Sequence, residues 1–389
     1  MTLAPTPVQS TPATTGTKTE ASSSGHRLES LDALRGFDMF WITGGGLLGA
    51  ALRKWGEGTV PESIGKQMVH VAWEGFHFED LIFPMFVFIA GASIVFSVPK
   101  MIERSGTAGA IRRILVRTFI LFLLGVFYSG GLARGVEEVR WMGVLQRIAL
   151  AYCGGSLLFI WLKPRGLIAA CITLLLGYWA LLKFVPVPGF GAGDYAEGHN
   201  LTNYLDKMYL AGRRYDGDHD PEGILSTLPA IASCLLGIFG GLWLQSGASK
   251  GRKVLGLAIA GGVALCLGWA WAPFFPVIKK LWTSSFVLVA AGWSALALSL
   301  FYWLIEVRGW RRWATPFVWI GLNPITIYIA GNVIEWPKVA ARITGGDLQK
   351  WLNESVHIAA GDLLTAIIAV SFSFLLAWFL HRRRIYLRV

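Results

Sequence analysis

Ionisable residues gather in one short stretch of the chain, HVAWEGFHFEDLIFP, which runs from His70 to Pro84. It contains two histidines, Glu74 and the adjacent carboxylates Glu79 and Asp80, and it continues directly into an apolar segment. A histidine titrates near neutral pH, so His70 can take a proton from an amine or a hydroxyl. A neighbouring carboxylate can orient the ring, as in other paired catalytic groups. The pattern predicts His70 as a catalytic base, with a merely solvated or structural histidine as the simpler alternative.

The same residues do not suggest a metal site. His70 and His77 lack the spacing of a zinc motif, since the sequence contains neither HExxH nor a Cys/His set. The four cysteines all lie in apolar runs and form no CxxC pair, which is typical of small buried hydrophobic residues. We therefore expect no metal and no disulfide framework.

The composition is that of a membrane protein. Of the 389 residues, 54% are hydrophobic and 15% are charged, whereas soluble domains carry about 25% charge. Apolar runs long enough to cross a bilayer recur along the chain, and they are continuous rather than alternating, which indicates helices. The sequence predicts an all-α polytopic bundle of about ten transmembrane helices. The net charge of +11 fits basic cytoplasmic loops and gives no reason to expect nucleic-acid binding.

The predicted spans have these approximate limits: 31–52, 80–99, 114–133, 143–162, 166–186, 226–246, 254–274, 284–305, 315–334 and 361–380. Basic residues concentrate in alternate loops and in the C-terminal tail, so the positive-inside rule places both termini in the cytoplasm. The His70 loop and the long connection 187–225 then face outward, and we expect that connection to be an ordered outer loop. Residues 1–26 are predicted to be a disordered tail, and 27–389 the transmembrane domain.

The first predicted span, with the sequence LDALRGFDMFW, contains three charged residues on one helical face: Asp32, Arg35 and Asp38. Charges inside a span are costly and usually face a polar interior. They form either a structural ion-pair cluster or a site where Arg35 meets phosphate on a cytosolic donor. Gly44–Gly46 are expected to interrupt this helix beside a ligand, with tight helix packing as the alternative.

Further polar residues are predicted on the same outer side as His70. They lie in the key stretch or near the outer ends of spans, and they are Trp73, Glu74, Asp80, Arg147, Asp220, Glu222 and Asn332. Their shared side predicts a polar mouth whose acidic groups suit a hydroxylated or cationic acceptor. No single one of these residues is specific, so the prediction depends on the group.

Six segments of the chain, in order from about Arg27 to the C-terminus, resemble the membrane domain of heparan-α-glucosaminide N-acetyltransferase and its bacterial relatives. They are RLESLDALRGFDMFW, HVAWEGFHFEDLIFPMFVFIAGASIVFS, GVLQRIALAY, DPEGILSTLPAI, KKLWTSSFVL and GLNPITIYIAGNVIE. The resemblance implies transfer of an acetyl group from cytosolic acetyl-CoA to a glucosamine amine on the far side of the membrane. The family's catalytic histidine falls on His70 and its aspartate on Asp80. Other motif positions fall on Arg140, Arg147, Asp220, Glu222 and Asn323.

Two departures from the family pattern concern the acceptor. Glu74 stands where the animal enzyme has asparagine, and we expect no counterpart of that enzyme's large N-terminal lumenal domain. Both favour a bacterial cell-surface or periplasmic sugar over heparan, and hence the bacterial inner membrane as the location. An amino sugar or glycan and membrane lipid are the expected partners. The oligomeric state is left open, with a homodimer as one alternative.

The expected mechanism is acetyl transfer with His70 as base and Asp80 orienting it. Arg35, Arg113 and Arg117 would hold the phosphates of acetyl-CoA, and Asn323 or a backbone N–H near Gly44–Gly46 would stabilise the oxyanion. Direct transfer and an acetyl-histidine intermediate are equally compatible with these residues. The rival functions are a sugar O-acyltransferase and a non-enzymatic transporter of a sugar or lipid-linked substrate.

Overall fold

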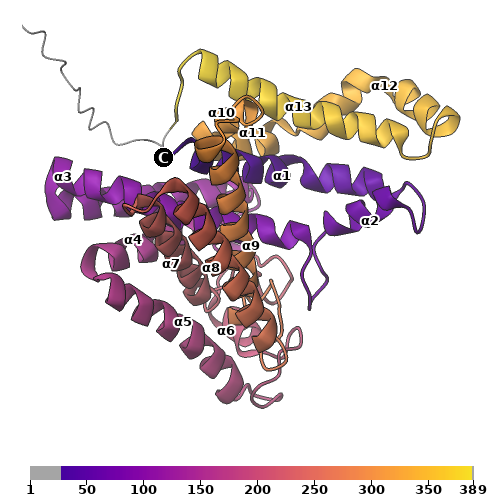
Figure 1. Ribbon diagram of the computed structural model, residues 1–389. Helices are drawn as coiled ribbons and strands as arrows, with labels where there is room; N and C mark the ends of the chain where they lie inside the picture. Colours follow the sequence, from indigo (N-terminus) through magenta and orange to yellow (C-terminus); the bar gives the residue numbers. More distant parts are fainter. Residues whose placement is uncertain (1–27, 388–389) are drawn as a thin grey trace, which may run out of the picture.

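Figure 1 shows a computed structural model of the chain, in which residues 28–387 are described. The predicted disordered tail, residues 1–26, lies outside this range. The described residues form helices throughout, with only isolated β-bridges and no strand. This confirms the all-α prediction.

The helices have the following bounds: α1 Glu29–Arg53, α2 Val60–Gln67, α3 Phe78–Tyr128, α4 Val144–Trp161, α5 Pro164–Phe184, α6 Leu201–Tyr209, α7 Thr227–Gln245, α8 Lys250–Trp271, α9 Ser284–Tyr302, α10 Thr315–Leu322, α11 Pro324–Ile334, α12 Trp336–Ser355 and α13 Ala360–Arg382. A 3₁₀ turn, Val136–Glu138, precedes α4, and a π-helical turn, Trp303–Val307, extends α9.

Among the described residues, seven helices are long and apolar enough to cross a membrane, or up to eight if the bent pair of α10 and α11 forms one span. The chain is therefore a polytopic membrane protein, but the count is lower than the predicted ten. The predicted spans 80–99 and 114–133 both lie in α3, which counts once. The predicted span 31–52 lies in α1, which is not in the set because charged residues and glycines make it less apolar.

The long helix α3 is broken at Gly106, which has φ 69° and ψ 173°. Glycine tolerates this positive φ because it has no Cβ. The stretch between the predicted spans 80–99 and 114–133 was expected to be a loop, but the chain is helical on both sides of the break at Gly106. The basic residues of this stretch are therefore fixed on two helical segments.

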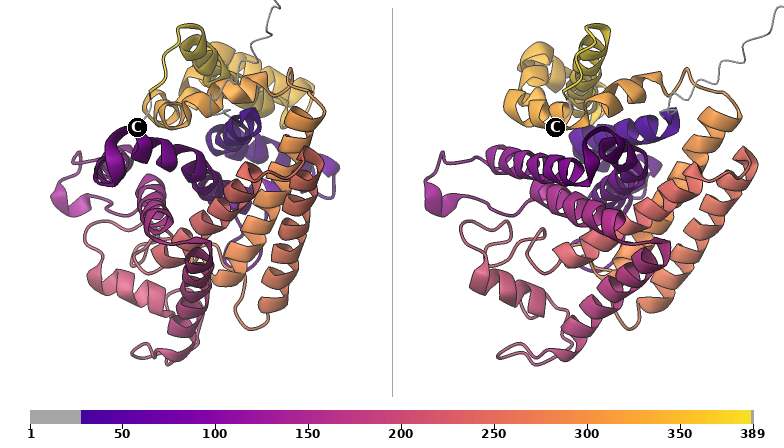
Figure 2. Two further views of the ribbon diagram at one scale, coloured as in Figure 1. Left: turned by 60° about the vertical axis from the view of Figure 1, so that its left-hand side comes forward. Right: turned by 90° about the vertical axis from the view of Figure 1, so that its left-hand side faces the viewer.

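The first half of α3 is largely buried, and α3 packs against α4 and α7, while α8 pairs with α9 and α1 pairs with α10 (Figure 2). Glycines allow the closest crossings. A Cβ at Gly91 of α3 would collide with the backbone carbonyl of Cys234 in α7, and one at Gly36 of α1 with that of Phe317 in α10. Small residues serve this purpose in membrane helices generally.

The predicted interruption at Gly44–Gly46 is wrong, because α1 is helical through all three residues. Gly44 instead faces Val370 of α13, where a Cβ would collide with the valine side chain. The packing alternative therefore explains this glycine.

Three helices were not anticipated, namely α2, α6 and the polar helix α12. Both short helices have a side-chain N-cap: Thr59 accepts a hydrogen bond from the backbone of Glu62, and Asn200 accepts one from that of Asn203. Helix α6 lies within 187–225, the connection predicted to be ordered and to contain no span. The side of the membrane on which it lies stays a prediction.

Candidate functional site

The loop that carries His70 lies between α2 and α3 and is held against the loop between α8 and α9. The backbone N–H of Gly75 donates to the carbonyl of Val277 at 2.9 Å, and Glu74 forms an antiparallel bridge with Ile278. Trp73 donates its indole N–H to the carbonyl of Tyr195 at 3.1 Å. The predicted substrate residues Trp73 and Glu74 therefore differ, since Trp73 anchors the loop and Glu74 is exposed.

Asp80 is in hydrogen-bond contact with the His70 ring. Its Oδ1 lies 3.0 Å from His70 Nδ1, and its Oδ2 accepts hydrogen bonds from the backbone N–H groups of His77 (3.0 Å) and Val71 (3.3 Å). Asp80 is fully buried, whereas the His70 side chain is 56% exposed. One carboxylate therefore caps the start of α3 and fixes one nitrogen of an accessible imidazole.

Lys279, which the sequence analysis did not single out, completes this group. Its Nζ lies 2.8 Å from His70 Nδ1, 3.1 Å from His70 Nε2 and 3.5 Å from Asp80 Oδ1. Burial lowers the pKa of Lys279, and the negative charges of Asp80, Glu222 and Glu79 oppose this effect without cancelling it. The imidazole is thus placed between a carboxylate and an amine.

A cavity of about 410 Å³ opens at His70. Its lining is Arg53, Ser63, Lys66, Gln67, Val69, His70 and His77. The predicted acidic residues Asp220 and Glu222 are not part of this lining. The charged residues of this lining are Arg53 and Lys66, and Lys66 is already paired with Glu62 at 2.6 Å.

The predicted acidic residues instead form a buried ion-pair cluster with Arg140. The guanidinium binds Asp220 through two hydrogen bonds, of 2.8 and 2.7 Å, and donates to Glu222 at 2.6 Å. Burial lowers the pKa of Arg140, but these carboxylates raise it by more, so the pKa lies above its ordinary value. Burial also raises the pKa of Glu222. The hydrogen bonds between these three groups therefore pair their charges inside the protein.

Arg147 on α4 is fully buried beside this cluster. It donates to the carbonyl of Gly223 at 3.2 Å and to the hydroxyl of Ser226, and it stacks over the ring of Trp282 at 4.9 Å. Asp206 of α6 accepts the backbone N–H groups of Ile224 (2.9 Å) and Asp220 (3.4 Å). Burial raises the pKa of Asp206 to about 6.

Two asparagines of the predicted site lie elsewhere. Asn332 is exposed on α11 and lines neither the cavity at His70 nor the donor cavity described below. Asn323 is fully buried at the junction of α10 and α11, which are bent by 82°. Its amide donates to the carbonyl of Ile385 at 3.0 Å and accepts from the N–H of Leu387 at 2.8 Å. Asn323 therefore anchors the C-terminal segment.

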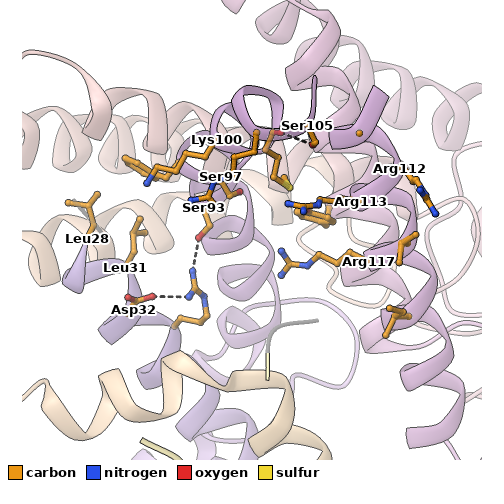
Figure 3. Close-up of a pocket in the computed structure, with 18 residues that line it drawn as sticks. Leu28, Leu31, Asp32, Ser93, Ser97, Lys100, Ser105, Arg112, Arg113 and Arg117 are labelled. Carbon is orange, nitrogen blue, oxygen red and sulfur yellow. Dashed lines mark hydrogen bonds and ion pairs between the residues drawn. The ribbon is translucent and has the colours of Figure 1, made fainter. Parts of the chain in front are cut away.

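A second and larger cavity, of about 1070 Å³, is strongly basic. We call it the donor cavity, and its charged lining residues are Asp32, Arg35, Lys100, Arg104, Arg112, Arg113 and Arg117. Figure 3 shows Arg113 and Arg117 pointing from one half of α3 into the cavity, towards Ser93 on the other half, whereas Arg112 points away. The predicted residues Arg35, Arg113 and Arg117 are therefore brought together.

Arg35 is held by the protein itself. It donates to Asp32 at 3.0 Å, to Ser93 at 2.6 Å and to the carbonyl of Gly321 at 3.3 Å. Arg117 lies over the ring of Tyr152 at 4.6 Å, and its Nε is buried without a hydrogen-bond partner. Arg35 thus has the contacts of a structural ion pair at the cavity wall, whereas Arg117 retains capacity for an anion.

A third cavity, of about 230 Å³, continues the donor cavity inward, since both share Arg35, Ser93, Ser97, Arg117 and Tyr152. We call it the inner cavity. Its remaining lining is mostly apolar and includes Phe86, Ile94 and Leu121 of α3 and Ile325 of α11. The polar entrance therefore leads to an apolar pocket within the bundle.

The cavity at His70 and the donor cavity lie at opposite ends of α1. Arg35 and Arg53 of α1 line one cavity each, and they are about 27 Å apart at 1.5 Å per helical residue. Along α3, the inner cavity reaches Phe86, which is about 9 Å from Asp80 by the same rise. In the described structure, the distance between the donor cavity and the His70 group is thus about the thickness of the hydrocarbon core of a bilayer.

Sequence reasoning missed Lys279, Arg53 and Lys66 near His70, and Lys100, Arg104 and Arg112 in the donor cavity. The three donor-cavity residues were used only as evidence of a cytoplasmic loop. The signal that could have identified Lys279 is its position in KKLWTSSFVL, next to a predicted outer span end. A further group, Glu197, Asp216 and His219, has metal-ligating side chains within 4.8 Å of one another. Lys280 forms ion pairs with two of them, at 2.9 and 3.0 Å.

Comparisons with known proteins identify relatives of this chain. It is 27% identical over 382 residues to heparan-alpha-glucosaminide N-acetyltransferase of Homo sapiens, an alignment that covers 82% of this chain and 55% of the human protein. It is also 27% identical over 387 residues to the protein of that name from Mus musculus, covering 82% and 56%. The chain spans about half the length of these curated relatives. No family model matches it.

Proposed function

The chain is a distant relative of the heparan-alpha-glucosaminide N-acetyltransferases, and we propose on this basis that it is a membrane N-acetyltransferase. Acetyl-CoA enters the donor cavity, and an amino sugar or glycan binds in the cavity at His70. The observation that carries the proposal is the arrangement of these two cavities at opposite ends of α1, with the donor cavity at the bend of α3 and the His70 cavity at its start. We place the donor cavity on the cytosolic side, which is the orientation expected from the basic loops.

The donor cavity suits coenzyme A because cationic groups surround its entrance. Arg113 and Arg117 point into it, and Lys100 and Arg104 contribute further positive charge. Guanidinium groups bind phosphate oxygens through two parallel hydrogen bonds, which makes arginine a suitable phosphate ligand. The apolar inner cavity then receives the acyl-bearing arm and directs the thioester towards Asp80 and His70.

His70 acts as general base in this proposal. Its Nδ1–H donates to Asp80, which leaves the lone pair of Nε2 to take a proton from the acceptor amine. The amine nitrogen attacks the thioester carbonyl carbon, and a C–N bond forms. Collapse of the tetrahedral intermediate breaks the C–S bond, and the proton held on His70 goes to the departing thiolate. An acetyl-histidine intermediate uses the same groups.

The cavity at His70 fits an amino sugar as acceptor. Its volume of about 410 Å³ is in the range of small-molecule sites. Its lining supplies hydroxyl, amide and imidazole groups that can bind sugar hydroxyls, and Arg53 suits a glycan that carries acidic groups. A bacterial cell-surface or periplasmic sugar in the inner membrane remains the proposed setting.

The test uses purified protein with labelled acetyl-CoA and glucosamine. His70→Ala is expected to abolish transfer, because it removes the base. His77→Ala is the matched control, since His77 lines the same cavity but its Nδ1 is bonded to the carbonyl of Val69 at 2.8 Å. Equal activity of wild type and His70→Ala would refute the mechanism.

Two further measurements separate the rival functions. Transfer to glucosamine but not to N-acetylglucosamine supports acylation of nitrogen, whereas equal transfer to both supports the O-acyltransferase. Coenzyme A should raise the melting temperature of the protein, an effect that a sugar transporter does not explain.

A further inference from the structure

We propose that Lys279 is a further catalytic residue, whose ammonium group donates a hydrogen bond to the thioester carbonyl oxygen as that oxygen becomes negatively charged. The inference rests on the proposed function and deepens it. Acyl transfer passes through a tetrahedral oxyanion, and a donor aimed at this oxygen is usually a large part of the catalysis.

The residues that sequence reasoning offered for this role are committed elsewhere. Both ends of the Asn323 amide bind the backbone of the C-terminal segment, at Ile385 and Leu387. Gly44–Gly46 lie inside the continuous helix α1, where backbone N–H groups serve the helix itself. An oxyanion donor for the reaction at His70 must therefore come from another element.

Lys279 is within hydrogen-bond reach of the His70 ring. Its Nζ is 2.8 Å from Nδ1 and 3.1 Å from Nε2, the nitrogen left to act as base when Nδ1–H donates to Asp80. It is also 3.5 Å from Asp80 Oδ1. A carbonyl carbon attacked by an amine at Nε2 must lie beside this ring, so its oxygen comes within the range of the Lys279 ammonium.

The loop around Lys279 is well fixed. The Lys279 carbonyl accepts the N–H of Trp282 at 2.9 Å, and Thr283 donates its N–H to the carbonyl of Ile278 at 3.2 Å. Trp282 is 1% exposed and adopts φ 53°, a positive angle that is rare for a bulky residue. Tyr178 donates its hydroxyl to the carbonyl of Leu281 at 2.5 Å. Such fixed geometry is what a preorganised donor requires.

The resting contact suggests how the site changes during the reaction. Without substrate, the Lys279 ammonium lies against the His70 ring, 2.8 Å from Nδ1 and 3.1 Å from Nε2. When the acceptor amine approaches Nε2, its N–H donates to the lone pair of this nitrogen. Lys279 then turns to the thioester oxygen, which receives the carbonyl π electrons as the C–N bond forms. The electrons return to the carbonyl carbon when the C–S bond breaks, and Lys279 gains and loses no proton.

The test compares Lys279→Met, Lys279→Gln and Lys279→Arg with Lys280→Met. Lys280 is the control because it pairs with Glu197 and Asp216 and has no contact with His70. We expect Lys279→Met and Lys279→Gln to lower kcat by about 10²–10³-fold, the usual loss on removing one oxyanion donor. Lys279→Arg should retain part of the activity, and Lys280→Met nearly all of it. The Kd of acetyl-CoA should change less than twofold in each variant.

A second readout needs no turnover. The rate at which diethyl pyrocarbonate modifies His70 is followed against pH, with His70→Ala identifying the modified site. Removing the positive charge in Lys279→Met should move the midpoint of this profile to higher pH, because a neighbouring cation disfavours imidazolium. A wild type that transfers no acetyl refutes the proposed function. If the wild type is active and the kcat values of Lys279→Met and Lys279→Gln lie within threefold of it, the role of Lys279 is refuted while the proposed function stands. An unchanged midpoint of the modification profile in Lys279→Met has the same meaning.

Discussion

Replacing Asp80 with asparagine tests the site most directly, because the two oxygens of Asp80 have different partners. Oδ2 accepts two backbone N–H groups, from His77 and Val71, and Oδ1 faces His70 Nδ1. An asparagine at this buried position must keep its carbonyl oxygen towards the backbone donors. The opposite orientation would leave buried N–H groups without acceptors, at about 1–3 kcal/mol each. Its NH₂ group is thereby directed at His70.

An NH₂ group in place of Oδ1 reverses the hydrogen bond to His70. Nδ1 must then accept, so the proton moves to Nε2 and this nitrogen can no longer act as base. A positioned general base contributes about 10²–10⁴-fold to rate, which corresponds to about 2.7–5.5 kcal/mol in the barrier. We expect Asp80→Asn to lower kcat in this range. The melting temperature should change little, because the cap on α3 is retained.

The assay is labelled acetyl transfer to glucosamine across a pH series, with Glu79→Gln as the matched control. Glu79 is the adjacent carboxylate, and its buried Oε2 has no hydrogen-bond partner. Glu79→Gln should stay within a few fold of wild type. If Asp80→Asn keeps kcat within threefold of wild type while the protein is folded, Asp80 does not set the tautomer and the reasoning fails.

Three further predictions concern other parts of the protein. Arg113→Gln and Arg117→Gln should each raise KM for acetyl-CoA about tenfold with little change in kcat, the loss expected for one charge-assisted hydrogen bond. An unchanged KM would show that these arginines do not bind the phosphates of the donor. Arg140→Met should destabilise the fold by about 3–5 kcal/mol, since it leaves buried carboxylates unpaired, and Asp220→Asn in the same chain should recover part of the lost melting temperature. Burial raises the pKa of Asp206 to about 6. The contribution of this protonated carboxyl to stability is therefore full below pH 4 and is lost as the pH rises through 6. Asp206→Asn should remove about 3 kcal/mol of pH dependence from the free energy of unfolding.

The sequence predicted those features that depend on one segment. Continuous apolar runs identified most of the membrane helices, and the spacing of His70 and Asp80 around the start of α3 identified the pair that the structure joins at 3.0 Å. Local chemistry was enough here, because a carboxylate at the third position of a helix is a common cap. The bend at Gly106 could not be predicted, since a basic polar stretch is as typical of a loop as of a bent helix.

Features that depend on several segments were not predictable. Lys279 reaches His70 because the α8–α9 loop pairs with the His70 loop, a contact between residues 209 positions apart. The acidic mouth was inferred from a shared side of the membrane, but side alone does not say which charges pair. Asp220 and Glu222 instead form ion pairs with Arg140. A single sequence contains no information on such partners unless a motif reports them.

Helix α3 has Asp80 at one end, a bend at Gly106, and then Arg113 and Arg117 on a segment that turns back towards its own first half. The helix α3 thus carries residues of both the His70 site and the donor cavity, and the bend at Gly106 is the only interruption along it. Leu121 lies beyond the bend and lines the inner cavity, so its size can be varied to admit a bulkier thioester without touching the imidazole, its carboxylate or the cap between them. Smaller side chains at this position, with Arg113 and Arg117 kept for the phosphates, are therefore the economical route to altered acyl preference.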